Sequence, residues 1–187
     1  MSPTLTSTGG SAERWGPLWG ARPADWGRCE EHQAPAYRAA LDRLDVHPGQ
    51  RVLDVGCGAG TLAFVAALGP SSASFTVAFD LDMDAAVATV EGAHDNRVRR
   101  VATFAGPIEA LAKGPQFDVA VANMIAEEVG PLLPMIRERL KPRGRLVTSG
   151  QLLSREAEWL SRLRANGFTP LALAAEGEWL GTTSEKR

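Results

Sequence analysis

A glycine-rich turn is the part of the sequence whose residue types point most directly to chemistry. Residues 51–54 read as the end of a strand, and Gly56, Gly58 and Gly60 follow at alternate positions before an apolar run. Such a turn between a strand and a helix lets a ligand lie against bare backbone at the helix N-terminus. Asp54 stands two residues before the first glycine, where it would repel a pyrophosphate. The segment therefore favours a ligand with positive charge.

The glycine spacing also argues against a dinucleotide, because Thr61 stands where that fingerprint needs its third glycine. S-adenosylmethionine has no phosphate and carries an ammonium and a sulfonium, so its charge suits Asp54. Strand, D-x-G-x-G-x-G and helix resemble the first motif of the class I methyltransferases. The resemblance implies that Asp54 helps to hold the amino group of S-adenosylmethionine and that its methionine end lies on the turn residues Gly56, Cys57, Gly58 and Gly60. The alternative is a glycine turn without a ligand.

A second acid, Asp80, ends the next predicted strand, which begins at Phe75. In nucleotide-binding α/β folds an acid at this place accepts both ribose hydroxyls, because its two oxygens match a vicinal diol. The alternative is a solvated acid that caps the following helix, although Asp82 and Asp84 are available for that. The position at the strand end favours the ribose.

The adenine is expected beside Leu81 and beside Phe104 and Ala105, which end the third predicted strand. Related enzymes often place an acid after that strand to accept the exocyclic amine. This sequence has none there, so a backbone carbonyl must take that role.

Asn123 ends the fourth predicted strand, where it is expected to face the methyl group, and it is both a cofactor-binding and the catalytic candidate. Methyl transfer from a sulfonium is an in-line displacement, in which the protein aligns the reactants and excludes water. An amine acceptor must be neutral, and the side-chain carbonyl of Asn123 could accept its N–H bond and orient its lone pair. The alternative is a strand-end asparagine that satisfies local backbone groups.

No general base stands out. Glu127 and Glu128 follow the Asn123 loop, but acids also suit the start of a helix. Glu31, His32 and Tyr37 lie in the N-terminal leader and are expected to be structural or solvated. No metal site is predicted, since neither of the two cysteines has a partner at metal-ligand spacing.

Beyond residue 50 strands and helices alternate, which predicts an α/β fold. Strands are expected at about 51–56, 75–81, 98–104, 117–123, 144–149, 168–175 and 178–183. Helices are expected at about 60–68, 83–92, 107–112, 128–140 and 154–166. The pattern predicts a doubly wound, seven-stranded, mostly parallel sheet whose last strand runs antiparallel after a hairpin at Glu176-Gly177.

Residues 48–183 resemble the PrmA-like branch, the methyltransferases of a ribosomal protein. The features that carry this resemblance are Phe117–Ile125, Leu140–Leu146 followed by Ser149-Gly150, and Gly177-Glu178-Trp179. That branch has an N-terminal substrate-recognition domain, which residues 1–47 do not resemble. We expect a disordered segment at 1–13, a Trp-rich helical cap at 14–47 and a methyltransferase domain at 48–187.

The formal net charge of −2 gives no electrostatic footprint for nucleic acid, and Arg97, Arg99 and Arg100 are expected in a solvated loop. No signal or membrane-spanning segment is visible, and two cysteines without disulfide spacing suit the cytoplasm. The prediction is an S-adenosylmethionine-dependent methyltransferase that acts on a nitrogen, or alternatively an oxygen, of a small molecule or peptide. The alternatives are a protein methyltransferase whose partner supplies substrate recognition and a methyltransferase-like protein that only binds ligand. The oligomeric state is left open.

Overall fold

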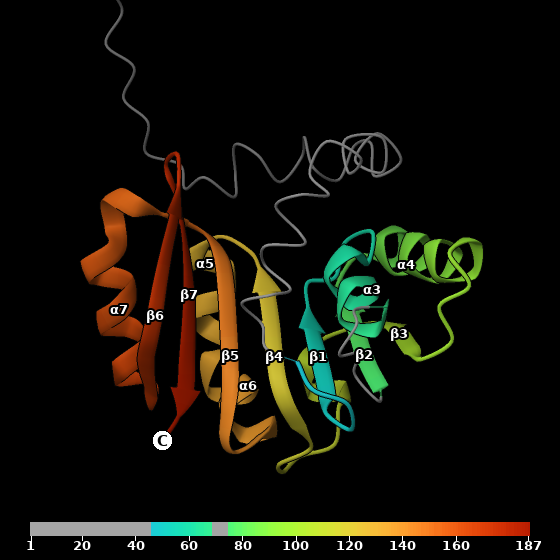
Figure 1. The fold of residues 1–187 in the computed structure, drawn as a ribbon, viewed down its shortest axis with the longest axis horizontal. Coiled ribbons are helices and arrows are strands. Elements are labelled where there is room, and N and C mark those ends of the chain that lie inside the picture. Colours follow the sequence, from blue (N-terminus) through green and yellow to red (C-terminus); the bar gives the residue numbers. More distant parts are fainter. Residues whose placement is uncertain (1–45, 69–74) are drawn as a thin grey trace, which may run out of the picture.

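Seven strands form one sheet in the computed structural model, which describes residues 46–68 and 75–187. The sheet order is β3-β2-β1-β4-β5-β7-β6 (Figure 1). The strands are β1 (Arg51–Val55), β2 (Phe75–Asp80), β3 (Val101–Ala105), β4 (Phe117–Asn123), β5 (Leu140–Leu152), β6 (Phe168–Glu176) and β7 (Trp179–Lys186). β1 to β5 are parallel, and β7 runs antiparallel to both its neighbours. The predicted fold class, with an antiparallel last strand, is confirmed.

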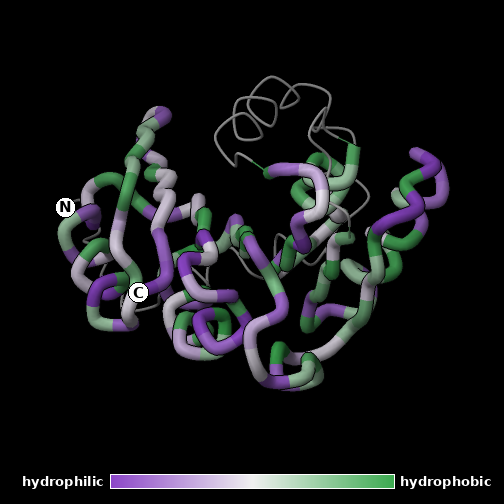
Figure 2. The backbone as a smooth tube through the Cα atoms, turned by 60° about the horizontal axis from the view of Figure 1, so that its bottom comes forward, coloured by the Kyte–Doolittle hydropathy of each residue, from purple (hydrophilic) through white to green (hydrophobic). Residues whose placement is uncertain are grey.

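Helices cover both faces of the sheet, as a parallel sheet requires. α3 (Thr61–Leu68) and α4 (Met83–Asp95) pack on the half formed by β1 to β3. The opposite face is covered by α5 (Ala126–Val129), α6 (Leu133–Arg139) and α7 (Glu156–Ala165). α4, at the right of Figures 1 and 2, carries both hydrophilic and hydrophobic residues along its length; it buries Ala85, Ala86 and Thr89 and leaves Val87 and Val90 exposed.

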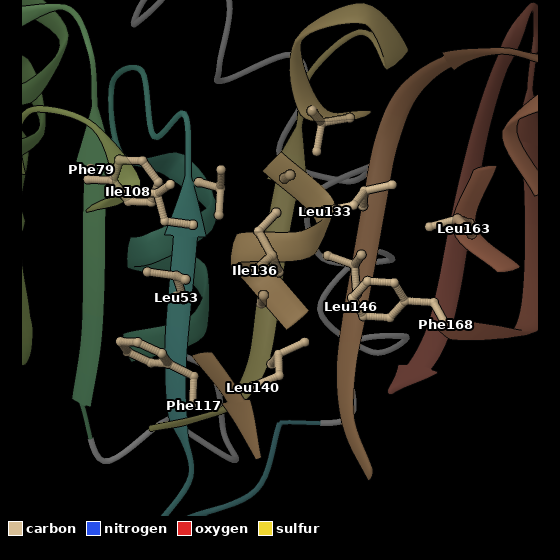
Figure 3. Packing of buried hydrophobic residues seen from close by; sticks show 14 of the residues in the cluster. Leu53, Phe79, Ile108, Phe117, Leu133, Ile136, Leu140, Leu146, Leu163 and Phe168 are labelled. Carbon is tan, nitrogen blue, oxygen red and sulfur yellow. The ribbon is translucent and has the colours of Figure 1, made fainter. Parts of the chain in front are cut away.

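The alternation of side chains along β1 decides which of its residues join the core. Leu53 and Val55 point into the larger apolar cluster beneath α6 and α7, whereas Val52 packs in a separate cluster with Ala66 of α3. Asp54 alternates with Leu53 and therefore points to the face that carries α3. Figure 3 shows the larger cluster, with its labelled side chains gathered between the strands and α6.

One of two prolines, Pro131, interrupts the helix that the sequence predicts at 128–140. Pro131 lies in a 3₁₀ turn, Gly130–Leu132, that separates α5 from α6, and Pro134 lies in the first turn of α6. Proline has no backbone N–H to donate within a helix, so it is tolerated only near a helix start. The first of the two observed helices, α5, begins at Ala126, two residues earlier than predicted, and the second, α6, begins at Leu133.

Two other boundaries differ from the prediction. The helix expected at 107–112 is a single 3₁₀ turn, Ile108–Ala110, after which Leu111 is extended. The strand expected at 98–104 begins at Val101, because α4 continues to Asp95 and the turn that closes it includes Val98. Arg97 has φ +56°, and the N–H of Val98 donates to the carbonyl of Ala93, which closes the helix in a Schellman-type turn.

The remaining turns follow the sequence closely. Pro48-Gly49 forms the turn before β1, with φ +93° at Gly49 and a hydrogen bond from Gln50 N–H to the His47 carbonyl. The final hairpin turns at Gly177-Glu178, one residue later than predicted, with Glu176 opposite Trp179. No helix in the described part of the chain is long and apolar enough to cross a membrane. The predictions for 1–13 and for the tryptophans of 14–47 lie outside the described residues.

Candidate active site

The central strands place the predicted site residues at one edge of the sheet. β1 pairs with β4, and their chains then leave in opposite directions, β1 toward β2 and β4 toward β5. Ligands of open α/β sheets bind at the carboxyl ends of the strands where the strand order reverses. Val55, the last residue of β1, lies opposite Ala122, so the glycine turn and Asn123 emerge side by side. The carboxyl edge between β1 and β4 is therefore the candidate active site.

The glycine turn is held open by its backbone. Gly56, Gly58 and Gly60 have φ values of +67°, +53° and +85°, a conformation that side chains with a Cβ rarely adopt. The N–H groups of Gly56 and Cys57 both donate to the Phe79 carbonyl at 3.0 Å. A Cβ built on Gly58 would meet no heavy atom within 4 Å. The middle of the turn thus presents bare backbone to open space.

Asp80 at the end of β2 is anchored by two backbone groups. Its Oδ2 accepts a hydrogen bond from the N–H of Gly58, and its Oδ1 accepts one from the N–H of Asp82, each at 3.0 Å. A carboxylate has about four acceptor positions, so two remain after these bonds. The carboxylate is therefore fixed in orientation and can still accept two hydroxyl groups. It also ties the glycine turn to β2.

Asp54 is a buried carboxylate near the carboxyl end of β1. Its side chain is 1% exposed, and neither oxygen makes a hydrogen bond of normal geometry to the described residues. Burial, partly opposed by the Ala63 backbone N–H and reinforced by the charge of Asp80, raises its pKa from 3.8 to about 7. A buried anion of this kind is costly unless a cation pairs with it. The position of Asp54 therefore suits a positively charged group.

The other predicted cofactor contacts lie around the same edge. Leu81 is 77% exposed, Phe104 stacks on Phe79 with ring centroids 5.4 Å apart, and Ala105 is half-buried. Cys57 is buried, and its sulfur lies 3.3 Å from Thr89 Oγ1. Burial, and then the Asp54 charge, raise the pKa of the Cys57 thiol to about 12, so it stays protonated. Cys57 packs the turn against α4.

Asn123 is exposed at the end of β4, and its Oδ1 accepts a hydrogen bond from Ser149 Oγ at 3.0 Å. Ser149 was not predicted as a site residue, although Ser149-Gly150 belongs to the segments that resemble the PrmA-like branch. Ser149 lies opposite Asn123 in the parallel pair of β4 and β5. That pairing could be found from the sequence only by knowing the strand register.

The two acids after Asn123 have different surroundings. Glu127 forms an ion pair with Arg155, which also binds Glu158 of α7. Partial burial, followed by the charges of Asp80 and Glu127, raises the pKa of Glu128. The charge of Asp80 at the site therefore acts on Glu128. Glu127 instead links α5 to the start of α7 through Arg155. The leader candidates Glu31, His32 and Tyr37 lie outside the described residues.

These residues fit S-adenosylmethionine. The unpaired Asp54 carboxylate suits an ammonium group, the open backbone at Gly58 suits a close ligand, and the anchored Asp80 suits a ribose diol. Within residues 46–68 and 75–187 no group of three His, Cys, Asp or Glu residues is arranged to hold a metal ion.

Alanine at two neighbouring glycines should separate ligand binding from stability. Gly58→Ala places its Cβ in open space, so we expect only the left-handed strain of about 1–2 kcal/mol together with a large loss of S-adenosylmethionine affinity. Gly60→Ala would bring its Cβ to 2.7 Å from both Phe64 and Thr89, so it should lose more stability than Gly58→Ala. Denaturant unfolding and calorimetry measure both effects. Wild-type affinity in Gly58→Ala would show that no ligand approaches this backbone.

Comparisons with known proteins agree with this arrangement. The family model of the ribosomal protein L11 methyltransferases (PrmA) matches residues 38–187. The ribosomal protein L11 methyltransferase of Desulforapulum autotrophicum is 34% identical over 159 residues, which cover 82% of this chain and 50% of that protein. The enzyme of the same name from Thermus thermophilus is 38% identical over 147 residues, covering 76% and 56%. The chain spans about half the length of the first of these relatives.

Solved structures show the same fold. The ribosomal protein L11 methylase of Lactobacillus delbrueckii subsp. bulgaricus superimposes with a TM-score of 0.72 at 28% identity, over 81% of this chain and 77% of that one. An S-adenosylmethionine-dependent methyltransferase from Aquifex aeolicus gives a TM-score of 0.66 at 16% identity, over 80% and 88%. At that identity the second likeness concerns the fold alone.

Proposed function

Because the chain belongs to the PrmA family of ribosomal protein L11 methyltransferases, we propose that it transfers a methyl group from S-adenosylmethionine to a polypeptide acceptor. One observation carries the proposal beyond family membership. The buried Asp54 carboxylate lacks a hydrogen-bond partner among the described residues and lies at the edge where the glycine turn opens. A neutral side chain would be more stable at that position, so the charge implies a cationic ligand.

Each residue has a defined part in binding the cofactor. Asp54 neutralises the amino group, and the turn at Gly56 to Gly60 accommodates the methionine end. Asp80 accepts the ribose hydroxyls while its bonds to Gly58 and Asp82 keep it in place. Leu81, Phe104 and Ala105 line the adenine position. Because Asp80 also anchors the turn, cofactor binding and the shape of the turn are coupled.

Asn123 supplies the contact to the acceptor. Bound S-adenosylmethionine provides an electrophilic methyl group, so the protein needs no covalent intermediate. The chain must orient a neutral lone pair and exclude water. The Oδ1 of Asn123 keeps one lone pair beyond its bond to Ser149, and that lone pair can accept an N–H from an amine. This favours a nitrogen acceptor over an oxygen acceptor.

A protein acceptor is better supported than the small molecule or peptide that the sequence favoured. The matched relatives are named as methyltransferases of a ribosomal protein. No feature of the site geometry described above favours a small-molecule acceptor over a protein. The acidic side chain of Glu128 at the site edge also suits a basic polypeptide segment. The protein acceptor, the second choice from the sequence, thus becomes the first.

Calorimetry with S-adenosylhomocysteine, the stable demethylated cofactor, tests the binding site. We expect Asp80→Ala to lose about 1–3 kcal/mol of binding free energy, the cost of an unpaired polar contact. Asp84→Ala is the matched control, because Asp84 is exposed on the first turn of α4 and its side chain makes no hydrogen bond to the site residues that the structure describes. Equal affinity in Asp80→Ala and wild type would contradict the ribose assignment.

The activity itself is tested by incubating the chain with labelled S-adenosylmethionine and purified ribosomal protein L11, a lysine-rich peptide or a metabolite extract. Transfer of label to the protein or the peptide, in a form that alkaline hydrolysis does not release, as expected of a methylated nitrogen and not of a methyl ester, supports the proposal. Tight binding of the demethylated cofactor without transfer to any acceptor would leave a ligand-binding protein instead. Binding of NAD in place of both cofactor forms would overturn the proposal.

A further inference from the structure

The strand β5 carries an irregularity where it passes Asn123. Its antiparallel pairing with β7 shifts between Thr148 and Gln151, so Ser149 and Gly150 form a bulge. Bulges re-aim side chains and are common beside active sites. This bulge lies at the carboxyl end of the strand, opposite the last residue of β4.

Ser149 of the bulge and Gln151, the residue after it, both contact the loop that begins at Asn123. Ser149 Oγ donates to Asn123 Oδ1 at 3.0 Å, and the Ser149 carbonyl accepts from Met124 N–H at 3.1 Å. The buried Gln151 donates through Nε2 to the carbonyls of Met124, at 2.8 Å, and Ser149, at 3.0 Å. The backbone of the catalytic loop is therefore tied to β5 at more than one point.

Glycine at position 150 is required by this close approach. Its φ is +88°, and a Cβ there would lie 3.0 Å from the Met124 carbonyl oxygen and 3.1 Å from Asn123 Oδ1. Only a residue without a side chain lets β5 lie this close to the amide oxygen. The bulge and the catalytic amide thus form one packed unit.

The same loop contacts the cofactor turn on its other side. A Cβ on Gly56 would lie 2.7 Å from the sulfur of Met124, so the Met124 side chain rests on the first glycine of the turn. The segment 123–124 is held between the bulge of β5 and the turn after β1. A displacement of the bulge would move Asn123 relative to the bound cofactor.

We propose that Ser149 is a positioning residue, which acts through Asn123 in the methyl transfer. The Ser149 hydroxyl occupies one lone pair of the Asn123 carbonyl and sets the orientation of the exposed amide. The second lone pair then points to the acceptor. Because the amide is already held in one orientation, it loses no further rotational freedom when the methyl group is transferred. This role rests on the proposed function for its kinetic consequence, but the hydrogen bond and its effect on Asn123 can be measured without any acceptor.

Nuclear magnetic resonance of the side-chain amides tests the bond directly. The chain has only three asparagines, Asn96, Asn123 and Asn166, and the spectrum of Asn123→Ala identifies the Asn123 signal by its loss. We expect Ser149→Ala to shift the Asn123 amide and lower its order parameter, and Ser149→Thr, which keeps the hydroxyl, to retain the wild-type values. Ser161→Ala, at an exposed serine of α7, is the matched control.

Kinetics complete the test. We expect Ser149→Ala to lower kcat about tenfold with the cofactor affinity within about twofold of wild type, and Ser149→Thr to restore kcat. In an Asn123→Ala background Ser149→Ala should have no further effect, because its partner is gone. Unchanged Asn123 amide signals in folded Ser149→Ala, or a Ser149→Thr variant as slow as Ser149→Ala, would overturn the positioning role. A shifted amide in a chain that methylates no acceptor would overturn the proposed function alone.

Discussion

The Asp54→Asn variant is expected to unfold less readily than the wild-type chain at pH 8 while it binds S-adenosylmethionine roughly 100-fold more weakly. Loss of function with a gain in stability is the signature of a charge that is kept for a ligand. Asp54 is suited to show it because its side chain is 1% exposed and has no hydrogen-bond partner among the described residues.

The stability change follows from the pKa of Asp54, which burial raises from 3.8 to about 7 in the folded chain. A raised carboxyl pKa favours the protonated form in the folded state, so its contribution to stability is present below about pH 4 and lost as the pH rises through 7. Above pH 7 the buried charge costs about 4 kcal/mol relative to an unperturbed carboxyl group. Burial of the asparagine amide in the variant also costs free energy, and this offsets part of the gain. The variant is therefore expected to be more stable than wild type by about 1–3 kcal/mol.

The binding change has the opposite sign, because the ammonium group of the cofactor requires the ionised carboxylate. Below pH 7 the protonated Asp54 must release a proton when the cofactor binds, so wild-type affinity should fall by up to about tenfold per pH unit. Asp54→Asn has no such proton and should show a flat profile over the same range. Calorimetry in two buffers of different ionisation enthalpy counts the released proton.

Asp118→Asn provides the control at the other end of the sheet. Asp118 accepts hydrogen bonds from Lys141 at 2.8 Å and from the Arg51 backbone N–H at 2.8 Å. Its removal should therefore lower stability by about 1–2 kcal/mol and leave cofactor affinity unchanged. If Asp54→Asn proved less stable than wild type at pH 8 and bound the cofactor normally, Asp54 would be a structural carboxylate.

The residues at strand ends were predictable because the fold places them together by rule. Parallel strands end at one edge of the sheet, so the glycine turn after Asp54, the acid Asp80 and the amide Asn123 meet once the βα alternation is recognised. The alternation of side chains along β1 also explains why Leu53 and Val55 join the larger apolar cluster while Asp54 points to the other face of the sheet. None of these positions needed knowledge of side-chain packing.

The parts that the sequence left undetermined depend on register and on contacts between distant segments. The bond from Ser149 to Asn123 needs the alignment of β4 with β5, and the bulge at Gly150 needs the pairing of β5 with β7. The ion pair of Glu127 with Arg155 distinguishes two adjacent acids that look equivalent in sequence. The break in the predicted helix at 128–140 could have been foreseen from Pro131.

Asn123→Ala is expected to lower kcat about 100-fold while cofactor affinity stays within about threefold of wild type. The reason is that the amide is exposed, accepts a hydrogen bond from Ser149, and presents its second lone pair at the edge beside the glycine turn. Its loss therefore removes orientation of the acceptor rather than binding of the cofactor. Single-turnover rates with labelled S-adenosylmethionine and an acceptor polypeptide measure the change.

Asn123→Asp and Asn166→Ala make the comparison specific. Asn123→Asp keeps an acceptor oxygen but adds a charge next to the Ser149 hydroxyl, so it should retain more of the rate than alanine if accepting the N–H of an amine is the main role. Asn166 caps the end of α7, donates to the Arg162 carbonyl at 2.8 Å and is remote from the β1–β4 edge, so Asn166→Ala should change stability but not kcat. A wild-type rate in Asn123→Ala would remove this residue from the mechanism. An equal loss in cofactor affinity would instead assign Asn123 to the cofactor site, because a residue that acts only on the acceptor leaves the binary complex unchanged.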